Sequence, residues 1–424
     1  MNKRFTLKNG IRVHQIPVEG TEAATVLVLI KVGSRYERLE INGAAHFIEH
    51  LMFKGTKKRP TTLDISRDLD SVGAEFNAFT GKDRTGYYVK AASEHLDHSI
   101  GLLYDMLFHS KYEPKEVKRE RGVIIEEINM YHDNPMMYVE DLFEQAIFEG
   151  STLGWEIAGT HKSMTEMTRA DVIAFRDQYY IPSEIVIAVA GKINGARTRK
   201  LLEATFGKVP VPKIERPPCF APFGKIAKQR VPRTKVQYKK TKQVQIALGF
   251  PSYGKTDKRT PAAKFLASIL GGTMSSRLFI SVRERKGLAY LVRAIQSEYE
   301  DVGTFMIQSG LDISRLDLAM KTIKQEIRKI KKHGVTAEEL RRAKDHVRGR
   351  VTLALEDSMR QADFYADQEM FQDKVLTPKE RLAEFDKVTR SQVQKAANDI
   401  LDEGRLSVAG IGPYRNSKEL LKHI

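Results

Sequence analysis

The chain has 424 residues, 41% of them hydrophobic and 29% charged, with a net charge of +16, which is typical of a globular protein. No stretch approaches the roughly 20 consecutive apolar residues of a membrane-spanning helix, and no apolar signal core follows the basic N-terminus "MNKRFTLKNG". The single cysteine, Cys219, excludes an intrachain disulfide framework and a zinc site built from cysteines, which fits a reducing, cytoplasmic setting.

The positive charge is concentrated in the second half of the chain. Residues 1–210 hold 28 basic and 29 acidic residues, whereas residues 211–424 hold 42 basic and 25 acidic ones. Two interpretations are open: a solvated basic surface, or a surface that attracts acidic peptides or other polyanions.

The first predicted elements are two strands and a short helix. The segments "IRVHQIPV" (11–18) and "ATVLVLIKVG" (24–33) are apolar enough for strands, and "HFIEHLMFKGT" (46–56) follows them. Asn42 is suited to cap a helix there and Gly55 to end it. On a helix His46 and His50 lie one turn apart on the same face, with Glu49 on that side.

This spacing of polar residues on an apolar helix indicates a metal site. Two neutral imidazoles one turn apart can bind the same ion, and Glu49 can accept a proton from water held on it. The order H-x-x-E-H is a known zinc arrangement, although such a match can also arise by chance on a surface helix. Zinc needs a third protein ligand, and a catalytic site leaves one position open for water.

A second helix is predicted from Pro114 to just before Pro135, and it supplies a candidate ligand. Glu120 and Glu127 lie on the apolar stripe of this helix, whereas Glu126 lies roughly 80–100° away on the more exposed side. A carboxylate on a buried stripe is costly unless a cation compensates it, and zinc would do so for Glu127. Glu120 is then placed to orient a ligating histidine. Ordinary glutamates at a helix edge are the alternative.

The rest of the chain alternates strands and helices around a proline-rich segment. Strands are predicted at 185–191, 244–250 and 406–412, and amphipathic helices at 316–334 and 337–357. Residues 209–233 are rich in proline and lack periodicity, which predicts a linker. We therefore expect an N-terminal domain over 1–208, a linker over 209–233 and a C-terminal domain over 234–424.

The two halves also match each other. "GAAHFIEHL" (43–51) aligns with "PAAKFLASI" (261–269), "TRADV" (168–172) with "TRSQV" (389–393), and "VAG" (189–191) with the same letters at 408–410. The offsets of 218, 221 and 219 indicate a duplicated α/β domain. His46, Glu49 and His50 align with Lys264, Ala267 and Ser268, so the fold itself does not require the polar set.

"HFIEHLMFKGT" together with "ERGVIIEE" (120–127) resembles the inverted-zincin metallopeptidases, a family that includes pitrilysin, insulin-degrading enzyme and mitochondrial processing peptidase. The resemblance covers the whole chain, through "NAFTGKDRTGYYV" (77–89), "LGWEIAGT" (153–160) and "GGTMSSRLFISVRERKGLAY" (271–290). Gly81, Lys82 and Asp83 depart from the family pattern, which affects substrate contacts and not the metal ligands. The resemblance implies an α+β fold of two homologous domains, each a mostly antiparallel sheet packed with helices.

The resemblance also implies a role for each matched residue. His46, His50 and Glu127 would bind one zinc ion, and Glu49 would be the general base. Substrate contacts would come from Asn77, Ala78 and Phe47, while Arg283 and Tyr290 match an Arg–Tyr pair that holds the substrate and stabilises the oxyanion. Without the resemblance, the expected interpretation is a solvated helix charge for Arg283 and a half-buried strand aromatic for Tyr290. An amphipathic helix is predicted to end at Gly287 and a strand to follow it, which places Tyr290 near their junction.

The expected activity is zinc-dependent endopeptidase cleavage of peptides or unfolded segments, bound as an added edge strand inside a closed chamber. Two other classes are weighed against it. A non-catalytic partner subunit would have lost zinc ligands, which this chain keeps, and a polyanion-binding protein lacks support from any nucleic-acid motif. Because the zinc set and the Arg–Tyr pair occur in one chain, the expected assembly is a homodimer with composite active sites and no different partner.

Overall fold

The computed structural model describes residues 2–212, 220–224 and 226–424, which form two compact units. Unit 1 comprises the described residues of 1–128, 155–220 and 351–376, and unit 2 those of 129–154, 221–350 and 377–424. Cys219 and the rest of residues 213–219, together with residue 225 of the predicted linker, lie outside the described residues. Of the helices described, none is long and apolar enough to cross a membrane.

Unit 1 is built on a six-stranded sheet in the order β1-β2-β6-β3-β5-β4. Only β2 and β6 pair in parallel, and the other neighbours are antiparallel. Strands β3 and β6 at the centre are apolar at every position except Thr25, because both faces of the sheet are covered. The strands are β1 (Lys3–Thr6), β2 (Arg12–Pro17), β3 (Ala23–Ile30), β4 (Glu75–Thr80), β5 (Thr85–Ala92) and β6 (Ile185–Gly191).

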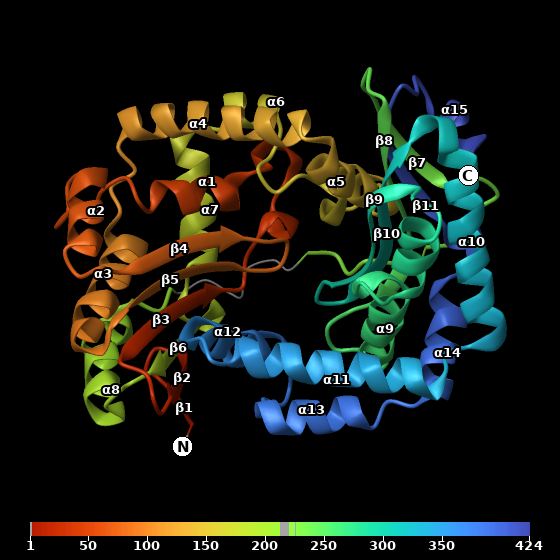
Figure 1. The fold of residues 1–424 in the computed structure, drawn as a ribbon. Helices are drawn as coiled ribbons and strands as arrows, with labels where there is room; N and C mark the ends of the chain where they lie inside the picture. The colour runs from red at the N-terminus through yellow and green to blue at the C-terminus, as the bar shows by residue number, and fades with distance from the viewer. Residues whose placement is uncertain (1, 213–219, 225) are drawn as a thin grey trace. The chain divides into compact units, whose positions relative to one another are not determined.

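Helices cover both faces of this sheet. Side chains of β3 alternate, so that Val26 and Val28 join the core with α1, α3 and α7, while Leu27 and Leu29 pack with α12 (Ser358–Phe371) on the other face. The helices are labelled in Figure 1. The remaining helices are α1 (Ala44–Leu51), α2 (Thr62–Asp70), α3 (Leu96–His109), α4 (Pro114–Asp133, whose last residues belong to unit 2), α6 (His161–Glu166), α7 (Arg169–Tyr179) and α8 (Gly195–Ala204).

Unit 2 repeats this plan with a five-stranded sheet in the order β7-β11-β8-β10-β9, in which β7 and β11 are parallel. Its strands are β7 (Arg233–Tyr238), β8 (Gln243–Tyr253), β9 (Ala289–Glu298), β10 (Val302–Asp312) and β11 (Ser407–Gly412). Its helices are α5 (Pro135–Ile147), α9 (Thr260–Ala267), α10 (Leu316–His333), α11 (Ala337–Ala354, whose last residues belong to unit 1), α13 (Pro378–Asp386), α14 (Arg390–Ile400) and α15 (Ser417–Leu421).

The strand order β2-β6-β3-β5-β4 of unit 1 matches β7-β11-β8-β10-β9 of unit 2, and α1, α3, α4 and α7 match α9, α10, α11 and α14 in chain order. The predicted fold class and the predicted duplication are confirmed. One feature was not expected from the sequence: the units exchange a helix. α12 comes from the second half of the chain and packs on sheet 1, whereas α5 comes from the first half and packs on β8 and β11 (Figure 1). A cut in the predicted linker would therefore leave each half without one helical layer.

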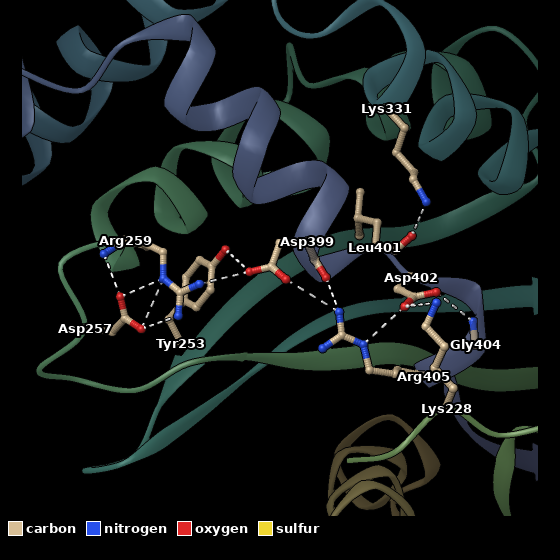
Figure 2. Close-up of polar contacts among 10 residues, drawn as sticks. All are labelled: Lys228, Tyr253, Asp257, Arg259, Lys331, Asp399, Leu401, Asp402, Gly404 and Arg405. Carbon is tan, nitrogen blue, oxygen red and sulfur yellow. Dashed lines mark hydrogen bonds and ion pairs between the residues drawn. The ribbon is translucent and has the colours of Figure 1, made fainter. Parts of the chain in front are cut away.

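A network of charged side chains fixes the end of α14 and the loop before α9 in unit 2 (Figure 2). Asp399, near the C-terminus of α14, accepts hydrogen bonds from Tyr253 (2.7 Å) and Arg259 (3.1 Å). Lys331 donates to the carbonyl oxygen of Leu401 just after the helix, where cations offset the negative end of the helix dipole. Arg259 precedes the first residue of α9, so this network also positions the start of that helix.

Candidate metal centre

Helix α1 presents the predicted polar set on one side and the core on the other. Phe47, Ile48 and Leu51 are buried in the core of unit 1. The rings of His46 and His50 lie side by side with their centroids 4.6 Å apart, as the helical period predicts. The Phe47 ring is fully buried, so a contact between this ring and a substrate would require the core to open.

The start of α1 is held by a residue that the sequence did not single out. The Glu37 carboxylate accepts hydrogen bonds from the backbone N–H groups of Gly43 (2.7 Å) and Ala45 (2.8 Å) and from the Asn42 amide (2.9 Å). The predicted cap at Asn42 is wrong, because Gly43 is the capping residue, with φ of 98°, and the Asn42 side chain donates to Glu37 instead. Burial raises the pKa of Glu37 to about 8, against the effect of these three donors.

Helix α4 begins and ends as predicted, and it brings Glu127 to the two histidines. Glu127 Oε2 lies 3.6 Å from His46 Nε2 and 3.4 Å from His50 Nε2. Three atoms bound at about 2.0–2.2 Å to a tetrahedral ion lie roughly 3.3–3.6 Å apart, so these two separations suit zinc. In the part of the chain that the structure describes, these three residues form the one cluster of this kind.

The Glu120 carboxylate lies between His50 and Lys54, and each of its two oxygens faces one of these side chains. Its Oε2 is 3.2 Å from His50 Nδ1, and its Oε1 is 2.8 Å from Lys54 Nζ. The contact with Nδ1 leaves His50 Nε2 free to face Glu127, which is the arrangement in which a carboxylate orients a metal-binding imidazole. Glu120 is buried and Glu126 is exposed, as the helical period predicted.

The charges at the cluster suit a bound cation. Burial and the neighbouring His50 lower the pKa of His46 to about 4, so its imidazole is neutral and offers a lone pair. Burial also acts to lower the pKa of His50, but hydrogen bonds to Glu120 and Glu127 outweigh it and raise that pKa to about 9. The negative charges of Glu120 and Glu127 therefore favour a proton on His50. A bound divalent cation would compensate the same negative charges.

Glu49 lies next to the cluster without belonging to it. Its carboxylate accepts a hydrogen bond from the Thr80 hydroxyl, at the end of β4. Burial raises the pKa of Glu49, and the bond from Thr80 acts in the opposite direction. A carboxylate with a raised pKa beside a metal site is suited to accept a proton. Thr80 was missed by sequence reasoning, although it stands in the segment "NAFT" that had been matched to the family.

The strand that carries Asn77 and Ala78 is the edge strand of its sheet. β4 pairs with β5 on one side only. Asn77 is exposed, and its side-chain oxygen accepts a hydrogen bond from the backbone N–H of Ala78. An edge strand offers backbone groups that an added strand can pair with.

Arg283 and Tyr290 lie together in unit 2. The Arg283 guanidinium carbon is 5.1 Å from the centroid of the Tyr290 ring, and Tyr290, on the edge strand β9, is 83% exposed. The helix predicted before Gly287 is in part a π-helical turn, Phe279–Glu284, and Gly287 follows it with φ of 54°. The strand predicted after it begins at Ala289.

Comparisons with known proteins find similar chains over almost the whole length of this one. The insulinase family (peptidase family M16) matches residues 13–161, and the peptidase M16 inactive domain matches residues 166–347. An uncharacterized zinc protease of Streptomyces coelicolor is 34% identical over 99% of this chain and 92% of its own, and one of Bacillus subtilis is 33% identical over 98% and 99%. The crystal structure of a protease from Helicobacter pylori superimposes with a TM-score of 0.91 at 25% identity, over 97% of this chain and 99% of that one.

Proposed function

Because the chain belongs to peptidase family M16, the insulinase family, and is a peptidase, we propose that it is a zinc-dependent endopeptidase that cleaves peptides or unfolded segments. The observation that carries the proposal is the cluster of His46, His50 and Glu127, with Glu49 beside it on the same helix. The relatives in Streptomyces and Bacillus are named zinc proteases, which supports the choice of metal.

The proposed roles follow from the chemistry of each side chain. His46, His50 and Glu127 hold zinc, one ion per chain, and Glu120 orients His50. When bound, zinc polarises the substrate carbonyl and makes the attacking water more acidic. Glu49 accepts the proton of that water and passes it to the leaving amine. Thr80 holds one oxygen of the Glu49 carboxylate, which leaves the other for the proton.

The substrate is proposed to pair as an added strand with the edge strand β4 beside Asn77 and Ala78. Pairing through the backbone favours extended chains over folded domains, because most backbone N–H and C=O groups of a folded domain are already paired with one another. Arg283 and Tyr290 are proposed to hold the substrate and to stabilise the oxyanion. A donor of this kind contributes on the order of 10²–10³ in rate.

We also propose a homodimer, in which two copies enclose a chamber and the zinc set of one chain works with the Arg283–Tyr290 pair of the other. The presence of both sets in one chain supports this assembly. Mixing an inactive Glu49→Gln chain with an inactive Tyr290→Phe chain tests it, because subunit exchange creates one intact composite site and restores part of the activity. No activity after demonstrated exchange means that both sets act within one chain.

The proposed activity is tested by zinc analysis of the purified protein and by cleavage of an unstructured fluorogenic peptide with and without a chelator. We expect about one zinc per chain, activity that the chelator removes, and activity that added zinc restores. Salt-dependent binding of nucleic acid by a protein that takes up no zinc would instead favour the polyanion-binding alternative. Zinc binding without cleavage of any peptide would favour the partner-subunit alternative.

A further inference from the structure

A cavity of about 230 Å³ lies in unit 2, between the end of α9 and the helix α11. Its walls include four hydroxyl groups and two cationic or hydrogen-bonding side chains of α11. The proposed peptidase mechanism uses none of them. The residues concerned are Ser268, Thr273, Ser275, Ser276, Arg342 and His346.

The position of this cavity in the duplicated fold is informative. α9 matches α1, and the sequence alignment pairs Ser268 with His50. α11 matches α4. Asn134 caps α5, the helix after α4, and Asp357 caps α12, the helix after α11, so aligning these two caps aligns α4 with α11. Counting back from these caps pairs Ala343 with Glu120.

The cavity is therefore the counterpart of the contact between His50 and Glu120. Ser268 and Ala343 both line it, and both are much smaller than the residues they replace. An imidazole and a carboxylate that fill this place in unit 1 give way to a hydroxymethyl group and a methyl group. The frame of the two helices is kept, and the side chains that would fill the space between them are missing.

The polar groups of the walls also differ: a ligating imidazole and the carboxylate behind it are replaced by hydroxyl groups, of which that of Ser276 donates to the carbonyl oxygen of Thr273 at 2.6 Å. Ser268 begins a π-helical turn, Ser268–Gly272, a rare element that is frequent at functional sites. The one carboxylate in the wall, Glu339, is already paired with Arg277 through bonds of 2.7 and 2.8 Å and accepts the backbone N–H of Thr336 at 2.8 Å. Its charge is therefore compensated within the protein.

Arg342 and His346 stand one turn apart on α11, where both line the cavity and both are exposed. Arg342 has a long ion pair of 3.9 Å with Glu338, so its guanidinium is only weakly engaged. An imidazole can donate a hydrogen bond in either tautomer, and a guanidinium always carries its charge. The excess of basic residues beyond residue 210 adds a long-range attraction for anions.

We propose that this cavity binds a small oxyanion, a phosphate or a carboxylate, held by Arg342, His346 and the hydroxyl groups of Ser268, Thr273 and Ser275. Its volume is below the roughly 300–1,000 Å³ of pockets for drug-sized ligands, so the ligand is small or is the end of a longer chain. The duplicated frame thus carries a cation site in one copy and an anion site in the other. The proposed anion site does not depend on the proposed peptidase activity.

The first test is calorimetric titration of the full chain with inorganic phosphate against chloride at equal ionic strength. We expect one phosphate per chain, and a loss of affinity of at least tenfold in Arg342→Gln, since a hydrogen bond to a charged group is lost. Arg341→Gln removes the same charge from the neighbouring position, which does not line the cavity and pairs with Glu338 and Asp345. Its affinity should stay within twofold of the wild type.

A second pair of probes distinguishes the source of the oxyanion. An N-acetylated dipeptide with a free carboxylate is compared with its C-terminal amide. Competition with phosphate by the acid alone would assign the site to a peptide C-terminus, and no competition by either would assign it to phosphate. Each of these results supports an oxyanion site, because the same residues bind the probe.

Two results overturn the proposal. One is that neither phosphate nor the dipeptide acid binds the wild type. The other is that Arg342→Gln and Arg341→Gln bind equally well, which would place the anion elsewhere on the basic surface. If Arg342→Gln does not fold, Arg342→Lys and His346→Gln take its place, and unchanged affinity in both is the same negative result.

Discussion

Helices α1 and α9 occupy the same place in two sheets of matching strand order, yet they carry different chemistry. Both pack an apolar side into the core of their unit. α1 adds His46, Glu49 and His50 to this frame, whereas α9 has Lys264 and Ala267, and Ser268 follows its last turn. The packing of α1 and α9 therefore depends on their apolar residues, and a few polar side chains decide what each copy can bind.

The two helices also begin in different ways. A buried carboxylate, Glu37, accepts the N–H groups at the start of α1. Before α9, Arg259 is held by Asp257 and Asp399 (Figure 2). Thr260, the first residue of α9, donates to the carbonyl oxygen of Gly254. The start of α1 therefore depends on one buried acid, and the start of α9 on a partly exposed network.

Replacing a ligand of the first copy by its counterpart from the second should have the largest effect. We expect His50→Ser to abolish zinc binding and peptidase activity, because two ligands do not hold zinc in a structural or catalytic site. Glu127→Gln should do the same, and Glu126→Gln, its exposed neighbour, is the matched control. Zinc content by mass spectrometry measures this, and normal zinc in Glu127→Gln with loss in Glu126→Gln would contradict the ligand assignment.

Glu49→Gln should lower kcat by about 10²–10⁴ while zinc content stays normal, because a base is lost and no ligand is. Steady-state cleavage of a fluorogenic peptide, combined with metal analysis of the same preparation, measures both quantities. Loss of zinc in this variant would mean that Glu49 is a ligand. Full activity would mean that another group takes the proton.

Glu120→Gln should weaken zinc binding about 10–100-fold, because His50 loses the carboxylate that orients it. Competition with a chelator of known affinity measures the change. Glu116→Gln is the control one turn earlier on α4, since Glu116 pairs with Arg119 and not with a histidine. Equal zinc affinity in both variants would mean that Glu120 does not orient His50 for zinc binding.

Glu37→Gln should destabilise the protein by about 1–3 kcal/mol, because an amide cannot accept all the donors that Glu37 satisfies and one is left buried without a partner. Urea unfolding measures the change in the free energy of unfolding. Glu40→Gln, an exposed acid in the same segment, should stay within about 0.5 kcal/mol of the wild type. Equal stability of the two variants would show that α1 does not depend on Glu37.

The smallest effect is expected in unit 2. Tyr253→Phe removes the hydroxyl that donates to Asp399, and we expect a loss of about 0.5–1.5 kcal/mol, since Arg259 still holds that carboxylate. Tyr238→Phe, at an exposed tyrosine, is the control for the same chemical change. A loss above about 3 kcal/mol would mean that the network is cooperative rather than redundant.

The features that depend on local periodicity could be predicted from the sequence. The buried strands β3, β6, β8 and β11 were predicted from apolar runs, and α4 from its length between two prolines. The placement of His46 and His50 on one face follows from the 3.6-residue period, and so does the contrast between buried Glu120 and exposed Glu126. These features could be predicted because each depends on residues within a few turns of one another.

The other features depend on contacts between segments far apart in the chain. Glu37 reaches α1 from six residues before its cap, beyond the range of local capping patterns, and Thr80 meets Glu49 across 31 positions of sequence. The exchange of α5 and α12 between units, and the cavity left by Ser268 and Ala343, depend on which surfaces meet in the folded chain. Such contacts are set by packing between distant segments, and no local pattern of residues encodes which segments those are.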